Sequence, residues 1–447
     1  MKNLLAFLAC VVCKATHCFL RLIGKGATSL PGVLALKICP DILRRAAEDV
    51  DVIAVTGTNG KTTSARMTEK ALRNAGKKVF ANRSGANLIS GITAEFILNR
   101  RLSGGAKCDW AVIECDEAAC RRVLAEIRPR ALLVTNLFRD QLDRYGAVTT
   151  PRDSIAAGLR ASPETVACLN ADCPMAASIA EQIPNKTVYF GFSDGRKSRS
   201  ESGEDSVCPV CGAQLRYSYV TYANLGGFSC KCGFARRRTD VSVRNVLDDG
   251  SFILEAAGDG GRICRAALPG LYNIYNAAGM TAAVTAAGIE LQNAVDAAAD
   301  FDCGFGRMES FPLGKKGARM ILIKNAAAAD QTLDYLRSVR EPMTLAMAVN
   351  DRIADGTDIS WLDDADFGKL ARMKELGRVL VAGDRAETAA QRIEREKIHC
   401  EIFKDYDTLI DSLTDEDAFV FILPTYTAML EMRKKLVRRL GGKNFWE

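Results

Sequence analysis

The stretch VDVIAVTGTNGKTTSARMTEKALRNAG, residues 50–76, decides the fold of this 447-residue chain. It predicts a buried β-strand, then a glycine turn, then a helix that begins near Lys61. Glycines let backbone N–H groups close around phosphate oxygens, and the N-terminus of a helix adds the positive end of its dipole. Lys61 then reaches the β- and γ-phosphates of a nucleotide, and the Thr62 hydroxyl is available to Mg²⁺. The stretch therefore predicts a phosphate-binding loop.

The loop is shorter than the strict Walker spacing, which requires a glycine at position 55, where this chain has Val55. A glycine turn with an incidental lysine is the alternative interpretation. The agreement of strand, turn, Lys-Thr pair and helix argues against that alternative. The predicted nucleotide-binding residues of the loop are Gly57, Thr58, Asn59, Gly60, Lys61, Thr62 and Thr63.

Short apolar runs separated by helix-like stretches continue along the chain. In the first half they lie at 50–57, 77–81, 109–115, 130–136, 165–171 and 186–192. This alternation predicts an α/β fold with a mostly parallel sheet covered on both faces. A second series, at 319–324, 342–350, 378–383, 399–405 and 418–424, predicts a separate Rossmann-like C-terminal domain.

The bulk composition excludes several classes of protein. With 48% hydrophobic and 26% charged residues, the chain is expected to form two or three folded domains. An excess of 60 basic over 54 acidic side chains suits anionic ligands but does not indicate a nucleic-acid-binding protein. Sixteen cysteines scattered through a large α/β chain indicate reduced cytosolic thiols rather than a secreted disulfide framework.

The first 22 residues begin with a lysine and an apolar stretch, as a signal peptide does. Lys14, His17 and Arg21 interrupt that stretch. We therefore predict an amphipathic helix packed on the protein, with a membrane-facing or signal role as the alternative. The face expected to pack consists of Leu4, Leu5, Leu8, Val11, Val12 and Phe19.

The alternation of predicted strands and helices is interrupted between about residues 193 and 240, where a cysteine cluster indicates an insertion. Cys208 and Cys211 form a C-x-x-C pair, and Cys230 and Cys232 form a C-x-C pair. Two close pairs joined by a loop are the pattern of tetrahedral Zn²⁺ coordination, and four ligands make the metal structural. The second pair is one residue shorter than usual, which makes Cys232 the least secure ligand. Unmetallated core cysteines and redox use are the alternatives.

Motifs beyond the loop resemble the Mur ligases, which activate a carboxylate with ATP as an acyl phosphate and join it to an amine. Residues 111–117, AVIECDE, 135–146, TNLFRDQLDRYG, 268–279, LPGLYNIYNAAG, and 306–310, GRMES, follow in the order of that family. The resemblance implies that Glu114 binds Mg²⁺ with Thr62 and that Asn276 holds the adenine. In isolation, Glu114 fits a solvated strand end equally well, and Asn276 fits a helix cap. Gln141 stands where many relatives have histidine, so their metal arrangement is not transferred.

Three further stretches narrow the resemblance to the MurT family, the ligase subunits of lipid II isoglutaminyl synthase. They are YSYVTYANLG between the cysteine pairs, 349–367 and 421–430. The resemblance implies amidation of the α-carboxylate of D-isoglutamate in the lipid II stem peptide, with ammonia from a separate class I glutaminase, GatD. His17 and His399 lie near no cysteine nucleophile motif, which independently argues against a glutaminase on this chain.

The same resemblance assigns roles to the C-terminal half. Asp355 is expected to complete the Cys-His pair of the glutaminase, with Asp358 as the competing candidate. Lys324 and Asn325 are expected to close over the nucleotide, although the alanines at 326–329 replace the family's proline and glycine. The implied division is an N-terminal segment 1–48, a central ATP-binding domain 49–305 with a zinc ribbon at about 205–238, and a C-terminal domain 306–447.

Two other functions remain open from the sequence. One is a Mur-type ligase that adds an amino acid, such as a folylpolyglutamate synthase or a stem-peptide ligase. The other is an ATP-binding scaffold without ligation. We expect a cytoplasmic protein that acts at the inner face of the cell membrane, with peripheral membrane contact, and that binds no nucleic acid.

Overall fold

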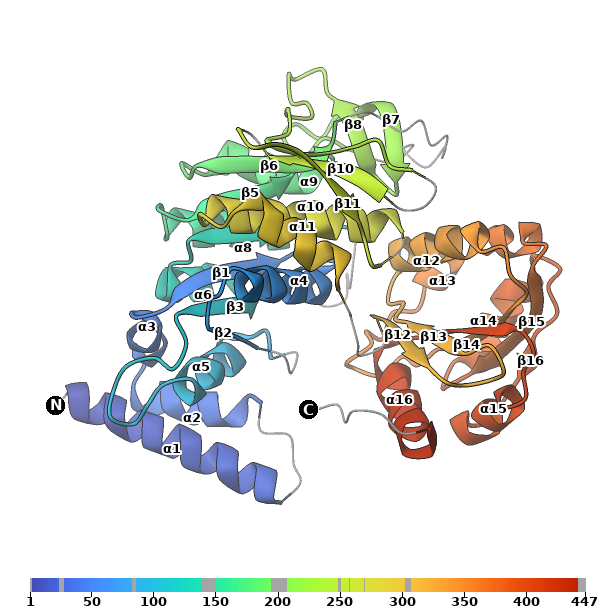
Figure 1. The fold of residues 1–447 in the computed structure, drawn as a ribbon, viewed down its shortest axis with the longest axis horizontal. Coiled ribbons are helices and arrows are strands. Elements are labelled where there is room, and N and C mark those ends of the chain that lie inside the picture. The colour runs from blue at the N-terminus through green and yellow to red at the C-terminus, as the bar shows by residue number, and fades with distance from the viewer. Residues whose placement is uncertain are drawn as a thin grey trace. The chain divides into compact units, whose positions relative to one another are not determined.

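A computed structural model describes residues 2–23, 28–82, 86–138, 149–193, 207–247, 251–256, 258–268, 270–301 and 307–440. The chain divides into two compact units, of which the first holds most of the chain up to Phe301 and the second holds mainly the part that follows (Figure 1). The predicted domain boundary at 305/306 lies outside the described residues, as do residues 139–146 of the TNLFRDQLDRYG motif.

The first unit is built on a sheet with the strand order β11-β10-β9-β6-β5-β4-β1-β3-β2. From β2 to β9 neighbouring strands pair in parallel, and β9, β10 and β11 pair antiparallel. The strands are β1 Asp51–Thr56, β2 Val79–Ala81, β3 Trp110–Glu114, β4 Ala131–Val134, β5 Val166–Asn170, β6 Thr187–Phe192, β9 Val241–Arg244, β10 Ser251–Ala256 and β11 Gly260–Arg265. The six predicted runs correspond to β1 to β6, and all six strands are confirmed.

Helices cover both faces of this sheet, as the alternation predicted (Figure 1). They are α4 Lys61–Asn74, α5 Ile89–Leu98, α6 Cys120–Ile127, α8 Thr149–Arg160, α9 Pro174–Ala177, the 3-10 helix Ser178–Gln182, α10 Leu271–Ala286 and α11 Leu291–Ala299. The central strands β1, β3 and β4 are almost wholly buried, because their continuous apolar runs have helices on both sides.

Three N-terminal helices, α1 Lys2–Leu22, α2 Leu30–Ile38 and α3 Ile42–Ala47, pack against α5 within the first unit. The predicted helix at residues 1–22 is present, but the prediction of its packed face is wrong. The small side chains Ala9 and Cys13 are fully buried against α2 and α5, whereas Leu4, Leu8 and Phe19 are exposed. Small residues allow the helices to approach closely, and the large apolar side chains then point outward. Among the described residues, Asn3–Leu22 is the one helical stretch long and apolar enough to cross a membrane.

The second unit has the strand order β12-β13-β17-β14-β15-β16, parallel except for the β12–β13 pair. The strands are β12 Arg307–Phe311, β13 Ala318–Ile321, β14 Met343–Ala348, β15 Leu376–Ala382, β16 Glu401–Ile402 and β17 Phe419–Pro424. The helices are α12 Ala326–Ser338, α13 Trp361–Asp364, the 3-10 helix Phe367–Arg372, α14 Ala386–Glu394, α15 Tyr406–Leu413 and α16 Tyr426–Leu440. This confirms the second strand-helix series.

The insertion between β6 and β9 forms its own two-stranded antiparallel hairpin, β7 Arg216–Tyr222 and β8 Leu225–Ser229. A small apolar cluster of Leu215, Phe228 and Phe234 packs beside Cys208 and Ala177. Because β9 pairs in parallel with β6, the insertion leaves the main sheet and returns to it at a neighbouring position.

Candidate active site

The predicted phosphate loop lies between the buried strand β1 and the N-terminus of α4, which begins at Lys61. Gly57 has φ +124° and Gly60 has φ +83°, a region of backbone conformation that favours glycine. A Cβ at Gly57 would lie 2.3 Å from Thr135 Oγ1, and one at Gly60 would lie 2.2 Å from Asn276 Oδ1. Backbone conformation and space thus both require glycine at these two positions.

The end of the neighbouring strand β4 fixes the loop from the side. Thr58 N–H donates to the Asn136 carbonyl at 2.8 Å, and Asn59 N–H donates to Asn136 Oδ1 at 2.9 Å. Thr135 Oγ1 donates to the Asn59 carbonyl at 2.7 Å. Thr135 and Asn136 were recognised in the sequence only as part of a motif. The structure gives them a physical role, which is to hold the loop backbone in place.

Lys61 lies at the start of α4, where its side chain is mostly buried and surrounded by acidic groups. Its Nζ forms an ion pair with Glu117 at 3.0 Å and also donates to the Gly57 carbonyl. Burial disfavours the ammonium, but the carboxylates of Glu117 and Glu114 outweigh it and hold the pKa of Lys61 above its usual value. Lys61 is therefore a fixed positive charge beside the loop. Glu117 was not singled out in the sequence, although it lies three residues after the predicted metal ligand.

Thr62 and Glu114, the two predicted Mg²⁺ ligands, are in direct contact, with Thr62 Oγ1 donating to Glu114 Oε2 at 2.7 Å. Both are oxygen donors of the kind that Mg²⁺ prefers. Asn82, which follows β2, exchanges two hydrogen bonds of 2.8 Å with the backbone of Glu114. Asn82 was not predicted as a site residue from the sequence. Its position just after a parallel strand, at the edge where β1 and β3 also end, was the signal that could have found it.

Asn276 is in the sixth position of α10, so the interpretation of it as a helix cap is wrong. The side chain is almost fully buried and accepts from Ser64 Oγ at 3.3 Å, and it lies against Gly60. The fold therefore brings a residue more than two hundred positions away to the start of α4. Thr63 is also buried in that first turn. The structure brings together the loop, Thr62, Glu114 and Asn276.

In the second unit, Asp355 is held in one orientation. It accepts hydrogen bonds from Thr427 N–H at 2.7 Å, from Thr427 Oγ1 at 2.5 Å and from Arg352 N–H at 3.2 Å. The competing candidate Asp358 is exposed and accepts from Ser360 N–H at 2.8 Å within its own turn. The geometry favours Asp355 as the positioned carboxylate.

A buried asparagine, Asn350, organises the surroundings of Asp355. Its Nδ2 donates to Thr427 Oγ1 at 2.9 Å, and its Oδ1 accepts from Tyr406 and from Asp384 N–H, each at 2.9 Å. Asn350 follows β14 and Thr427 follows β17, two neighbouring parallel strands. Neither residue was predicted from the sequence to have a role in the site.

Lys324 and Asn325 precede α12 of the second unit. The Asn325 side chain caps this helix by accepting from Ala328 N–H at 2.9 Å. A capping residue stabilises its helix because it satisfies an orphan backbone donor. Helix capping alone is a sufficient reason for an asparagine at position 325. The contact of Lys324 and Asn325 with a nucleotide stays a prediction.

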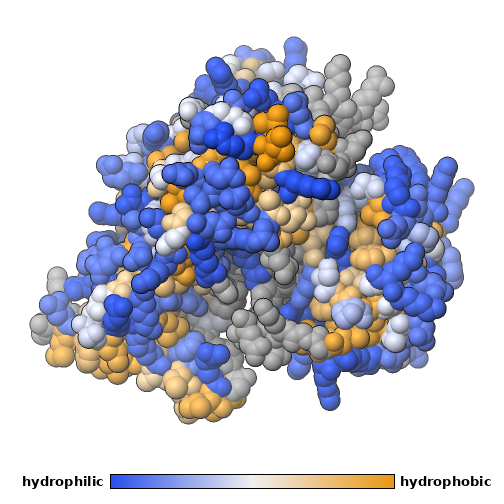
Figure 2. Space-filling view, viewed as in Figure 1, coloured by the Kyte–Doolittle hydropathy of each residue, from blue (hydrophilic) through white to orange (hydrophobic). Residues whose placement is uncertain are grey.

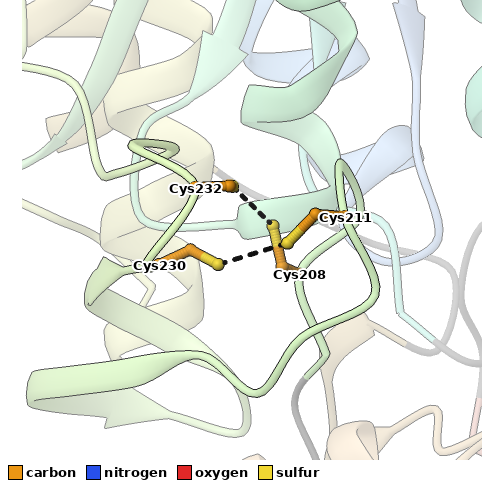
Figure 3. A group of neighbouring side chains, drawn as sticks. All are labelled: Cys208, Cys211, Cys230 and Cys232. Atoms are coloured by element: carbon orange, nitrogen blue, oxygen red, sulfur yellow. Dashed lines mark hydrogen bonds between the residues drawn. The ribbon is translucent and has the colours of Figure 1, made fainter.

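The four predicted zinc ligands converge, as Figure 3 shows, with all four Sγ atoms within 4.8 Å of one another. Cys208 Sγ lies 3.7 Å from Cys232 Sγ, and Cys211 Sγ lies 3.5 Å from Cys230 Sγ. A tetrahedral ion with Zn–S bonds of ~2.3 Å places its sulfurs ~3.8 Å apart, so the cluster fits zinc. The short C-x-C spacing does not move Cys232 out of the cluster.

We expect Cys232→Ser to lower the bound zinc and the thermal stability of the chain together, because structural zinc contributes directly to folding. Cys232 is exposed, so the substitution creates no cavity, unlike one at the buried Cys208. Cys18→Ser, at another exposed cysteine, is the matched control. Metal content by mass spectrometry and the Tm are measured for both. Unchanged zinc in Cys232→Ser removes this residue from the ligand set.

A fully buried carboxylate, Asp172, connects the insertion to the main sheet. It accepts from Arg236 Nε at 2.5 Å, from the Tyr275 hydroxyl at 2.7 Å and from Phe192 N–H at 2.9 Å. Arg236 lies four residues after Cys232, and Tyr275 precedes Asn276 on α10. If the Asp172 carboxylate lost its charge, the mostly buried guanidinium of Arg236 would lose its ion-pair partner.

We therefore expect Asp172→Asn to destabilise the first unit by about 3–5 kcal/mol. Asp259→Asn removes the carboxylate of an exposed ion pair with Arg262, and we expect less than about 1 kcal/mol from it. Urea unfolding monitored by tryptophan fluorescence compares the two variants. Equal urea midpoints for the two variants would show that the buried Asp172–Arg236 pair contributes no more to stability than the exposed pair does.

The sequence of this chain matches two known domain families. The Mur ligase middle domain matches residues 55–212, and the MurT ligase C-terminal domain matches residues 322–429. A subunit MurT of lipid II isoglutaminyl synthase (glutamine-hydrolyzing) from Streptococcus pneumoniae is 33% identical over 98% of both chains. The chain belongs to the MurT family. A MurT subunit of the same synthase from Staphylococcus aureus is 31% identical over 94% of this chain and 95% of its own.

Solved structures support the same fold for this member of the MurT family. A pseudomurein peptide ligase type C from Methanothermus fervidus superposes with a TM-score of 0.67 at 20% identity, covering 90% of this chain and 80% of the other. At that identity the likeness concerns the fold alone. The predicted Mur ligase fold is thereby confirmed. The family matches, and not this superposition, show that the protein is a Mur-type ligase.

Proposed function

We propose that this chain catalyses the ATP-dependent amidation of the α-carboxylate of D-isoglutamate in the stem peptide of lipid II. The ammonia comes from a partner subunit, a class I glutaminase of the GatD type, that hydrolyses glutamine. The relatives in Streptococcus pneumoniae and Staphylococcus aureus carry the name of this glutamine-hydrolysing synthase. We propose that the reaction takes place at the cytoplasmic face of the membrane that holds the lipid.

The single observation that carries the ligase proposal is the contact between Thr62 and Glu114 beside Lys61. A hydroxyl and a carboxylate 2.7 Å apart, next to a glycine loop at a helix N-terminus, are arranged to receive a magnesium nucleotide. Mg²⁺ held there would neutralise charge on the β- and γ-phosphates. We assign phosphate binding to Gly57–Thr63 and Lys61, and adenine binding to Asn276, with Lys324 and Asn325 as contributors from the C-terminal domain.

The proposed chemistry has two steps. A carboxylate oxygen of the substrate attacks the γ-phosphorus of ATP, ADP leaves, and an acyl phosphate forms. Ammonia then attacks the carbonyl carbon, inorganic phosphate leaves, and the nitrogen loses a proton to give the amide. Lys61 and the loop N–H groups stabilise the charge on the transferred phosphoryl group. The residues thus act mainly by positioning and electrostatics.

Glutamine hydrolysis in this proposal depends on Asp355. A carboxylate fixed by Thr427 can orient the imidazole of a partner's Cys-His pair, as the third member of a catalytic triad does. We propose that the domain 306–447 carries this partner surface, that the domain 49–305 carries the ligase site, and that the segment 1–48 supports the latter. The zinc ribbon at about 205–238 has a structural role.

The test is ADP release by the purified chain with lipid II as substrate. We expect release with ammonium alone, and with glutamine only when a GatD-type glutaminase is added. Mass spectrometry of the product should show replacement of one hydroxyl by an amino group. Incorporation of an amino acid in place of ammonia would favour an amino-acid-adding Mur-type ligase, and nucleotide binding without any product would favour the scaffold.

A further inference from the structure

Helix α1 exposes a continuous apolar surface. Leu4 is 69% exposed, Leu8 47% and Phe19 61%, and Leu22 at the end of the helix is 81% exposed. Figure 2 shows hydrophobic surface along the region that α1 and α2 occupy in Figure 1. Contiguous exposed apolar surface of this kind usually marks a contact with a protein or a membrane.

The exposed residues form one stripe along the helix. Leu4, Leu8, Ala15, Phe19 and Leu22 follow one another at intervals of three, four or seven residues, which places them on the same side. This side is opposite to the one that packs on the protein through Ala9 and Cys13. The apolar stripe is therefore free of charged residues and faces outward.

Helix α1 is nevertheless attached to the body of the first unit. Ala9 and Cys13 are fully buried against α2 and α5, and Lys14 Nζ donates to the carbonyls of Leu98 at 3.3 Å and Arg100 at 2.8 Å. If α1 crossed a membrane, Lys14 would lose its hydrogen bonds to both carbonyls and its charge would lie in the hydrocarbon core. Cleavage as a signal peptide would uncover the buried side chains that α1 covers. The packing of Ala9 and Cys13 and the hydrogen bonds of Lys14 therefore favour a helix that remains attached to the first unit.

The charges around the stripe identify the partner. Residues 1–40 contain no aspartate or glutamate, while the basic residues there are Lys2, Lys14, Arg21, Lys25 and Lys37. A second copy of this chain would bring two such basic segments together, which is unfavourable. An anionic lipid surface offers both hydrocarbon for the stripe and negative charge for the exposed Arg21 and Lys37.

We propose that α1 is an interfacial helix that docks the protein on an anionic bilayer, with Leu4, Leu8 and Phe19 inserted at the boundary of headgroups and acyl chains. The docking requires no nucleotide, glutaminase or peptidoglycan precursor, so it stands independently of the proposed reaction. Where that reaction also holds, docking brings the ligase site to a lipid-linked substrate.

The test uses the full-length chain and vesicles of phosphatidylcholine and phosphatidylglycerol in about equal amounts. Sedimentation should recover the chain with these vesicles, and much less with pure phosphatidylcholine or at high salt. The triple variant Leu4→Gln, Leu8→Gln, Phe19→Gln leaves the buried face intact, and we expect it to lower the vesicle partition coefficient at least about tenfold. The matched control replaces three exposed apolar residues outside the helix, Leu102→Gln, Ile263→Gln and Ile402→Gln.

Three results would overturn the proposal. The first is equal partitioning of the triple variant and the control. The second is retention of the chain in cell membranes after alkaline carbonate extraction, which indicates a span. The third is a dimer in analytical ultracentrifugation that the triple variant converts to a monomer, which assigns the stripe to a second copy. ATP turnover of the triple variant with a soluble substrate analogue stays normal in each case if the proposed reaction is correct, so the two proposals fail separately.

Discussion

Lys61→Ala is expected to lower substrate-dependent ATP turnover by about 10²- to 10³-fold or more. Lys61 is the cation at the start of α4, beside the Gly57–Gly60 turn, and nearby carboxylates keep it protonated. Alanine removes the charge that the transferred phosphoryl group requires. Without Lys61, Glu117 also adds uncompensated negative charge to the site. The measurement is ADP release with saturating ammonium and lipid II.

Lys70→Ala is the matched control for this variant. Lys70 lies on the same helix and pairs with the exposed Asp300, an interaction of little energetic weight. We expect Lys70→Ala to keep its turnover, and circular dichroism should show both variants folded. If Lys61→Ala retained its turnover, the phosphate loop would have been assigned wrongly, and the ligase proposal would fail with it.

Asp355→Asn is expected to lower glutamine-dependent amidation in the complex by about 10²- to 10⁴-fold, while amidation with free ammonium remains unchanged. Asparagine has the shape of aspartate and can still accept from Thr427 N–H, so the local fold survives. The substitution removes the charge that orients and stabilises the imidazole of the partner, together with the oxygen that accepts from Thr427 Oγ1 and Arg352 N–H. Glutamate release and amide formation are measured in parallel, with each nitrogen source.

Asp358→Asn serves as the control, because Asp358 lies three residues away in the same loop and is exposed. A selective loss in Asp358→Asn instead of Asp355→Asn would transfer the role to the second aspartate. An equal loss of ammonium-driven activity in Asp355→Asn would place this residue in the ligase reaction and contradict its assignment to the partner site.

Much of the architecture could be predicted because its signals are local. The apolar runs of β1, β3 and β4 and the glycines and lysine of 57–61 indicated a parallel sheet and a phosphate loop before any tertiary contact was known. Cysteine spacing likewise indicated a four-thiolate cluster. Strand β9 was missed because VSVR is short and follows the insertion, so its pairing with β6 depends on a long-range contact.

The sequence by itself determined the alternation of strands and helices, the glycine requirement of the loop and the four cysteines that form the cluster, since each follows from local patterns. Only the tertiary structure decided that Glu117 pairs with Lys61, that Asn82 supports Glu114 and that Thr427 fixes Asp355. It also decided which face of α1 packs. A helical pattern reports which residues share a face, but the side that is buried depends on how closely the neighbouring helices approach, and here the small residues Ala9 and Cys13 allow the closest packing.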